Sequence, residues 1–81
     1  MTREPLIARR RRFAARLEAT PPDRRVQTVA EAMESDGISA RFISGAWTVR
    51  WLGRAASSTE SAAAAVRNWT VRVLQEFDHA A

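Results

Sequence analysis

The sequence contains no cysteine, no lysine and no tyrosine, and it has no long hydrophobic segment. Without cysteine, neither a disulfide framework nor a thiolate metal site can stabilise so small a chain, which excludes the class of secreted disulfide-rich mini-proteins. The longest apolar run, residues 62–66, is far shorter than the ~20 residues that cross a bilayer, and the N-terminus lacks the apolar core of a signal peptide. We therefore expect a cytoplasmic protein with no membrane association.

The 81 residues suffice for one domain with a single hydrophobic core. A fold of this size is worth about 4–12 kcal/mol, at 0.05–0.15 kcal/mol per residue. With so small a margin, we expect most of the large apolar side chains to contribute to the core.

All 13 basic residues are arginine, and the nine acidic residues leave a net charge of +4. Two interpretations fit the exclusive use of arginine. It reflects a GC-rich genome, or it serves a surface that binds carboxylate or phosphate, which suits the planar guanidinium. The charge is also unevenly distributed, because basic residues dominate 1–16 and 41–72 and acidic residues dominate 17–40 and 73–81. This pattern predicts separate basic and acidic regions.

Residues 5–19 are predicted to form a first helix, because proline suits the first helical turn and apolar side chains then recur at helical spacing. Its apolar line consists of Leu6, Phe13 and Leu17. The opposite side carries an arginine stripe of Arg9, Arg12 and Arg16, with Arg11 to the side. Arg10 falls near the apolar edge, where its stem can pack while its charge reaches water.

The sequence predicts two further helices, at residues 21–36 and 59–78, each introduced by a capping box: Thr20 with Asp23, and Ser57 with Glu60. The first of them ends at Gly37, since a left-handed C-cap suits glycine, and its apolar face comprises Val26, Val29, Ala30 and Met33. The last helix buries Ala62, Val66, Trp69, Val73, Leu74 and Phe77. Its outer side carries Arg67, Asn68, Arg72, Gln75 and Glu76.

After Gly37 the apolar period changes from 3.6 to 2, which predicts strands at residues 38–43 and 46–52 around a two-residue turn. This register pairs Phe42 with Trp47 and Ile38 with Trp51. The predicted inner face comprises Ile38, Phe42, Trp47, Val49 and Trp51, and the outer face Ser39, Arg41, Thr48 and Arg50. Residues 54–57 form either a short third strand or a turn. The predicted fold is one α+β domain of ααββα order, with an antiparallel hairpin packed against three helices.

The sequence offers no catalytic, cofactor-binding or metal-binding constellation. Its single histidine, His79, lies near the end of the sequence, where no triad can be assembled around a held imidazole. Glu31, Glu34 and Asp36 have no histidine or cysteine near them, so we interpret them as a solvated acidic face. The glycines are isolated, which excludes a phosphate-cradling loop. We expect a non-enzymatic binding protein without a cofactor.

The arginines are the strongest candidates for binding a partner. Five arginines in one helix repel one another, a cost that a purely structural helix avoids, although a solvated helix face is the alternative. Tryptophan is enriched at interfaces, but we assign Trp51 and Trp69 to the core. The predicted contacts for phosphates or for an acidic protein surface are Arg9, Arg11, Arg12, Arg16, Arg41, Arg50 and Trp47, the last beside the hairpin turn.

Residues 47–66, Trp-Thr-Val-Arg-Trp-Leu-Gly-Arg-Ala-Ala-Ser-Ser-Thr-Glu-Ser-Ala-Ala-Ala-Ala-Val, resemble the arm-type DNA-binding domains of phage integrases. In both, strands run into a capped, alanine-rich helix. Those domains look three-stranded, and this resemblance implies DNA binding for about a quarter of the chain. The whole chain resembles in kind the small proteins of phages and mobile elements. Among them are anti-CRISPR inhibitors of type I surveillance complexes, which share its length and clustered charge.

We therefore expect a protein, monomeric or weakly dimeric, that docks on a host protein or nucleoprotein complex. It would act as an anti-CRISPR-type inhibitor that blocks the binding of target nucleic acid. One alternative is a small DNA- or RNA-binding protein that contacts phosphates through the first helix or the hairpin. Another is a subunit-like or antitoxin-like protein with a dedicated partner chain. The first is favoured because the acidic regions repel nucleic acid over part of the surface.

Overall fold

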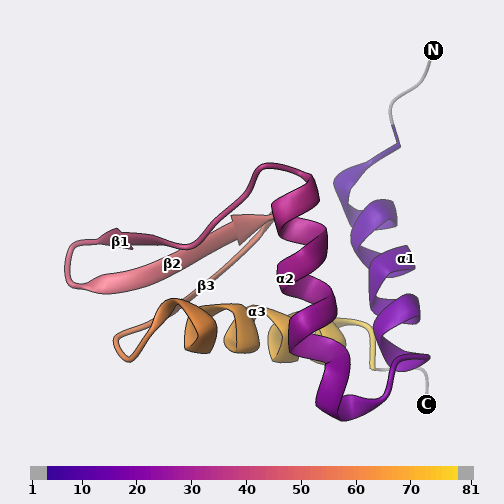
Figure 1. Ribbon diagram of the computed structural model, residues 1–81. Coiled ribbons are helices and arrows are strands. Elements are labelled where there is room, and N and C mark those ends of the chain that lie inside the picture. The colour runs from indigo at the N-terminus through magenta and orange to yellow at the C-terminus, as the bar shows by residue number, and fades with distance from the viewer. Residues whose placement is uncertain (1–3, 79–81) are drawn as a thin grey trace.

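The order of elements is α1 (Leu6–Glu18), a 3₁₀ turn η1 (Pro22–Arg24), α2 (Arg25–Ser35), β1 (Arg41–Ile43), β2 (Ala46–Trp51), β3 (Arg54–Ser58) and α3 (Ala62–Glu76) (Figure 1). This computed structural model describes residues 4–78. The strands form one antiparallel sheet of order β1-β2-β3, against which α3 packs. The predicted α+β class is confirmed, and the undecided segment after Gly53 is a third strand. Within the described residues, no helix is long and apolar enough to cross a membrane.

Two tight turns build the sheet. Ser44 and Gly45 have φ values of 51° and 85°, and Leu52 and Gly53 have values of 51° and 78°. Positive φ at both central residues matches the type I′ turn, whose twist suits the flanking strands. The sequence signals the first turn but not the second, because leucine rarely adopts a positive φ.

The predicted register of the first hairpin is confirmed at the turn, where Phe42 lies opposite Trp47. The expected pair of Ile38 with Trp51 is wrong, because β1 begins only at Arg41, opposite Thr48, and Trp51 pairs only with Arg54 on the β3 side. Ile38 serves the end of α2: its N–H donates to the Met33 carbonyl oxygen at 2.8 Å. This hydrogen bond belongs to the cap expected around Gly37.

The core lies between the helices and the inner face of the sheet. Trp51 is at its centre, with its ring centroid 5.0 Å from those of both Phe13 and Trp69. The Trp69 indole N–H lies 3.2 Å from the carbonyl oxygens of Trp51 and Arg54, which ties α3 to the second turn. Core positions for Trp51 and Trp69 are therefore confirmed. The largest fully buried side chains are Trp69, Leu17, Met33, Val29, Val49 and Val73.

Three expected core positions are wrong. Phe42 is 62% exposed, because the hairpin tip reaches beyond the helices that cover the rest of the sheet (Figure 1). Leu6 is exposed, since α1 buries the i, i+4, i+7 line of Arg10, Ala14 and Leu17. Ala30 is also exposed, while Ala32, two residues further along α2 and on the other side of the helix, packs against the core. Apolar periodicity predicts which face of a helix or strand is buried, but not how far the neighbouring elements extend to cover it.

Both predicted capping boxes are wrong. The Thr20 hydroxyl donates to the Arg16 carbonyl oxygen at 2.7 Å, and η1 and α2 begin without a side-chain cap. Ser57 belongs to β3, so α3 starts later, at Ala62, and its N-cap is Ser61, whose hydroxyl accepts the Ala64 N–H at 3.0 Å. A run of several hydroxyl residues offers more than one cap, and the third strand decides which one is used.

Glu76, at the end of α3, joins three parts of the chain. Arg10 of α1 donates to both of its carboxylate oxygens, from Nε and Nη2, each at 2.8 Å. Arg54 of β3 donates to the same oxygens, from Nε at 3.1 Å and from Nη2. Arg10 Nη1 also donates to the Leu52 carbonyl oxygen at 2.9 Å. The placement of Glu76 on the outer side and of the Arg10 charge in water is therefore wrong, and Arg10 is only 5% exposed.

The ion-paired cluster of Arg10, Arg54 and Glu76, called here the clamp, predicts a loss of stability in acid. Hydrogen bonds from Arg10, and then from Arg54, lower the pKa of Glu76 from 4.5 to about 2. Because the folded-state pKa lies below the unfolded one, the stabilisation is fully present above about pH 4.5 and is lost as the pH falls toward 2. We expect about 1–3 kcal/mol to be lost in this window, measured by urea unfolding at several pH values.

Glu76→Gln should lower the free energy of unfolding by about 3 kcal/mol at pH 7 and remove this pH dependence, because Arg10 stays buried without its counter-ion. The control is Glu60→Gln, whose side chain is 75% exposed and lies 3.7 Å from Arg67. It should change stability by less than about 0.5 kcal/mol. Equal urea midpoints for the two variants at pH 7 would contradict a stabilising clamp.

Candidate binding surfaces

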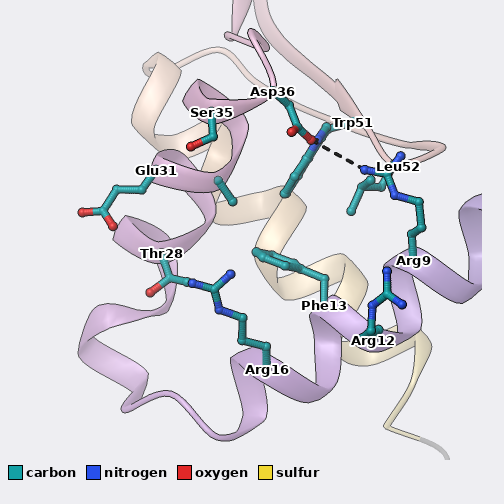
Figure 2. Close-up of a pocket in the computed structure, with 11 residues that line it drawn as sticks. Arg9, Arg12, Phe13, Arg16, Thr28, Glu31, Ser35, Asp36, Trp51 and Leu52 are labelled. Atoms are coloured by element: carbon teal, nitrogen blue, oxygen red, sulfur yellow. Dashed lines mark hydrogen bonds and ion pairs between the residues drawn. The ribbon is translucent and has the colours of Figure 1, made fainter.

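A groove of about 590 Å³ lies between α1 and α2 (Figure 2). Its volume is in the range of ligand pockets, about 300–1,000 Å³. One wall is basic and comes from α1, with Arg9, Arg12 and Arg16. The other comes from α2 and the residue after it, with Thr28, Glu31, Ser35 and Asp36. The apolar lining between these walls comprises Phe13, Ala32, Trp51 and Leu52.

The helical spacing of the arginine stripe brings its three members to one wall, as predicted, but each has a partner within the chain. Arg9 lies 3.8 Å from the Asp36 carboxylate, and Arg12 forms a two-hydrogen-bond pair with Glu4. The Arg16 guanidinium lies 5.7 Å from the Phe13 ring centroid. Figure 2 shows Arg12 and Arg16 on either side of Phe13. The wall is therefore less basic than the stripe suggests.

Asp36 lines the groove beside Trp51 (Figure 2). Its carboxylate accepts the Trp51 indole N–H at 2.9 Å, so the buried ring has its polar group satisfied. The solvated acidic face predicted for the second helix thus needs a correction at Asp36, which is exposed yet bonded to a core residue. The two residues are 15 positions apart, and no local pattern reveals this contact.

Arg11 lies outside the groove, with its guanidinium 5.5 Å from the Phe77 ring centroid. The structure therefore separates it from the arginines of the stripe. Trp47 is half-buried and packs against the core, and its ring lies 5.3 Å from that of Phe42. Phe42 is the exposed member of this aromatic pair at the hairpin tip.

The outer face of the sheet is the second surface. Strand alternation and register place seven residues on it, none of them acidic: Arg41, Ile43, Ala46, Thr48, Arg50, Ala55 and Ser57. Arg41 lies opposite Thr48, and Arg50 is two residues further along β2, which makes the two arginines diagonal neighbours. Both are exposed, and within residues 4–78 neither forms an ion pair.

A smaller hollow of about 390 Å³ adjoins this face near the second turn. Arg50 and Ala55 line it from the sheet, and Leu6 and Ile38 line it from neighbouring segments. The exposure of Leu6, unexpected from the sequence, thus leaves an apolar rim beside Arg50.

No group of three or more His, Cys, Asp or Glu side chains in residues 4–78 is arranged to hold a metal ion. His79 falls outside the described residues. No family model, no curated protein and no solved structure matches the chain.

The groove yields a prediction for Asp36→Ala. Removing the acceptor of the Trp51 indole N–H should lower the free energy of unfolding by about 1–2 kcal/mol. In a ¹H–¹⁵N spectrum the Trp51 indole proton should move upfield while that of Trp69 stays in place. Glu34→Ala is the matched control, because Glu34 is exposed and its side chain has no ion pair in residues 4–78. An unmoved Trp51 resonance in Asp36→Ala would argue against the bond.

Proposed function

We propose that this protein binds nucleic acid through the outer face of its sheet. The observation that carries the proposal is the contrast between two sets of arginines. Those of α1 have carboxylate or aromatic partners within the chain. Arg41 and Arg50, in contrast, are diagonal neighbours on a face with no acidic residue, and neither forms an ion pair with any residue from 4 to 78. An exposed guanidinium can bind a phosphate through two parallel hydrogen bonds.

The neighbours of these arginines suit close approach to a nucleic-acid backbone. Thr48 and Ser57 add hydroxyl groups that can donate to phosphate oxygens, and the alanines leave the face flat. An antiparallel β-ribbon fits the major groove of duplex DNA, so such a face can lie in or along it. The acidic residues of α2, which disfavour nucleic acid in the sequence-based interpretation, do not belong to this face.

Helix α3 packs against β2 and β3 and so supports the part of the face that carries Arg50. Its Arg72 donates to the Ala55 carbonyl oxygen at 3.1 Å, and its Asn68 donates to the Ser57 carbonyl oxygen at 2.8 Å. Groups held by packing and by hydrogen bonds lose less conformational entropy on binding. The arrangement therefore supports a preformed platform.

The test is Arg41→Ala/Arg50→Ala, with a labelled 20-base-pair duplex in fluorescence anisotropy. Affinity should fall by about 10–100-fold at ~50 mM salt, and the slope of log K against log[salt] should decrease in magnitude by about 2, one for each lost phosphate contact. Arg24→Ala/Arg67→Ala removes the same charge from exposed positions on η1 and α3 and should change affinity by less than about threefold. Equal losses in the two variants, or no binding of duplex DNA, single-stranded DNA or RNA, would refute the proposal.

We propose, as a second candidate, a non-enzymatic inhibitor that docks on a host nucleoprotein complex in the anti-CRISPR manner. The groove between α1 and α2 favours it, since aromatic groups and arginine together are typical of protein-binding hot spots. A partner would place an apolar side chain on Phe13 and carboxylates against the basic wall.

Arg12→Glu/Arg16→Glu tests this second candidate against the first. Both side chains are exposed, so the fold should tolerate the change. The double variant should lose capture of a purified type I surveillance complex, because like charge then faces the partner's carboxylates. Arg41→Ala/Arg50→Ala should retain capture. If the unaltered protein captures no complex in a pull-down, the second candidate is eliminated while the first still stands.

A further inference from the structure

The two edges of the sheet differ. At the β3 edge, the backbone groups of Ala55 and Ser57 point away from β2, because the alternation of hydrogen-bonded pairs starts with Trp51 and Arg54 at the turn. The two carbonyl oxygens accept the hydrogen bonds from Arg72 and Asn68 of α3. Helix α3 therefore closes this edge, as helices that cover a sheet edge do.

The β1 edge is open in the part of the chain that the structure describes. Ile43 and Ala46 flank the first turn as a hydrogen-bonded pair, so the N–H and C=O of Phe42 point outward. The same strand exposes two large apolar side chains in succession, Phe42 at 62% and Ile43 at 54%. Natural edge strands are usually protected by shortness, charge, proline or a covering element, and in residues 4–78 β1 has only its length of three residues and Arg41.

We infer that β1 pairs with β1 of a second copy of the chain, antiparallel about a twofold axis at Phe42. The two sheets would then form one sheet of six strands. Phe42 lies opposite the other copy's Phe42, and the two residues exchange both of their outward hydrogen bonds. Arg41 lies opposite Ile43 of the other copy.

A second copy fits this edge because a three-residue strand with outward peptide groups at its centre is its own complement under twofold rotation. A register centred on Arg41 would set the arginines of the two copies against each other, and like charges directly opposite are destabilising. The register about Phe42 avoids this. It also extends the tilted contact between the Phe42 and Trp47 rings into a row of four aromatic rings across the axis.

The area at this edge sets the strength of the pairing. If a fully buried aromatic side chain covers 150–250 Å², the exposed parts of Phe42 and Ile43 amount to about 200 Å² per copy, against ~800 Å² per partner in a standard stable interface. The dimer is therefore weak in free solution. It strengthens wherever two copies are held close together, because their effective concentration rises.

The absence of cysteine allows a test by single-cysteine crosslinking without background. Under mild oxidation at about 100 μM protein, Phe42→Cys should form a disulfide-linked dimer, because Cα atoms of a hydrogen-bonded pair are about 5.5 Å apart. Arg41→Cys alone and Ile43→Cys alone should remain monomeric, whereas their equimolar mixture should give the heterodimer, identified by mass. Ser57→Cys, on the β3 edge, is the control and should stay monomeric. Equal dimer yields from all four single variants would indicate random collision and overturn the register.

Analytical ultracentrifugation of the unaltered chain is the second test, because it measures association without any substitution in β1. Association should increase between about 0.05 and 2 mM, and Phe42→Lys, at an exposed position that the fold tolerates, should abolish it. A chain that remains monomeric at about 2 mM overturns the inference. No nucleic acid is present in either experiment, so the outcome is independent of the function proposed above.

Discussion

The ion pairs of the Glu76 carboxylate hold α1, β3 and α3 together, and the arrangement of the other elements depends on them. It receives Arg10 from α1 and Arg54 from β3, while Arg10 also holds the Leu52 carbonyl oxygen in the second turn. A buried guanidinium is tolerated only when its donors are satisfied, and the carboxylate and this carbonyl oxygen together achieve that. The second turn is fitted to the clamp, because a Cβ at Gly53 would lie 3.1 Å from Arg10 Nη1.

The clamp also explains why charge counted along the sequence overstates the binding surface. The chain has no lysine, so arginine performs structural tasks as well as any recognition. Arg25, for example, donates to the carbonyl oxygens of Leu17 and Thr20 at the end of α1, at 2.8 and 3.1 Å. When the arginines that bond to groups within the chain are set aside, Arg41 and Arg50 of the outer sheet face are exposed and free of ion pairs within residues 4–78.

Several features encoded by neighbouring residues could be predicted, although the helix caps at Thr20 and Ser57 and the second turn could not. Features that join distant segments could not be predicted. The Gly37 cap, the first hairpin register and the buried stripe of α3 all follow from residues close together in the chain. The pairing of Arg10 with Glu76 spans 66 positions and leaves no local trace. For the candidate sites, spacing correctly grouped the α1 stripe and the outer-face arginines. It could not show that Glu4 pairs with Arg12, or that the open edge carries Phe42.

The contact between the two ends of the fold also affects synthesis of the chain. Helix α1 emerges first, yet its buried arginine has no counter-ion until the last turn of α3 has been made. Until then, α1 is exposed to solvent or makes non-native contacts. The separation of 66 positions between Arg10 and Glu76 also slows the formation of their ion pair. A nascent chain that stops before Glu76 should therefore lack native packing of α1.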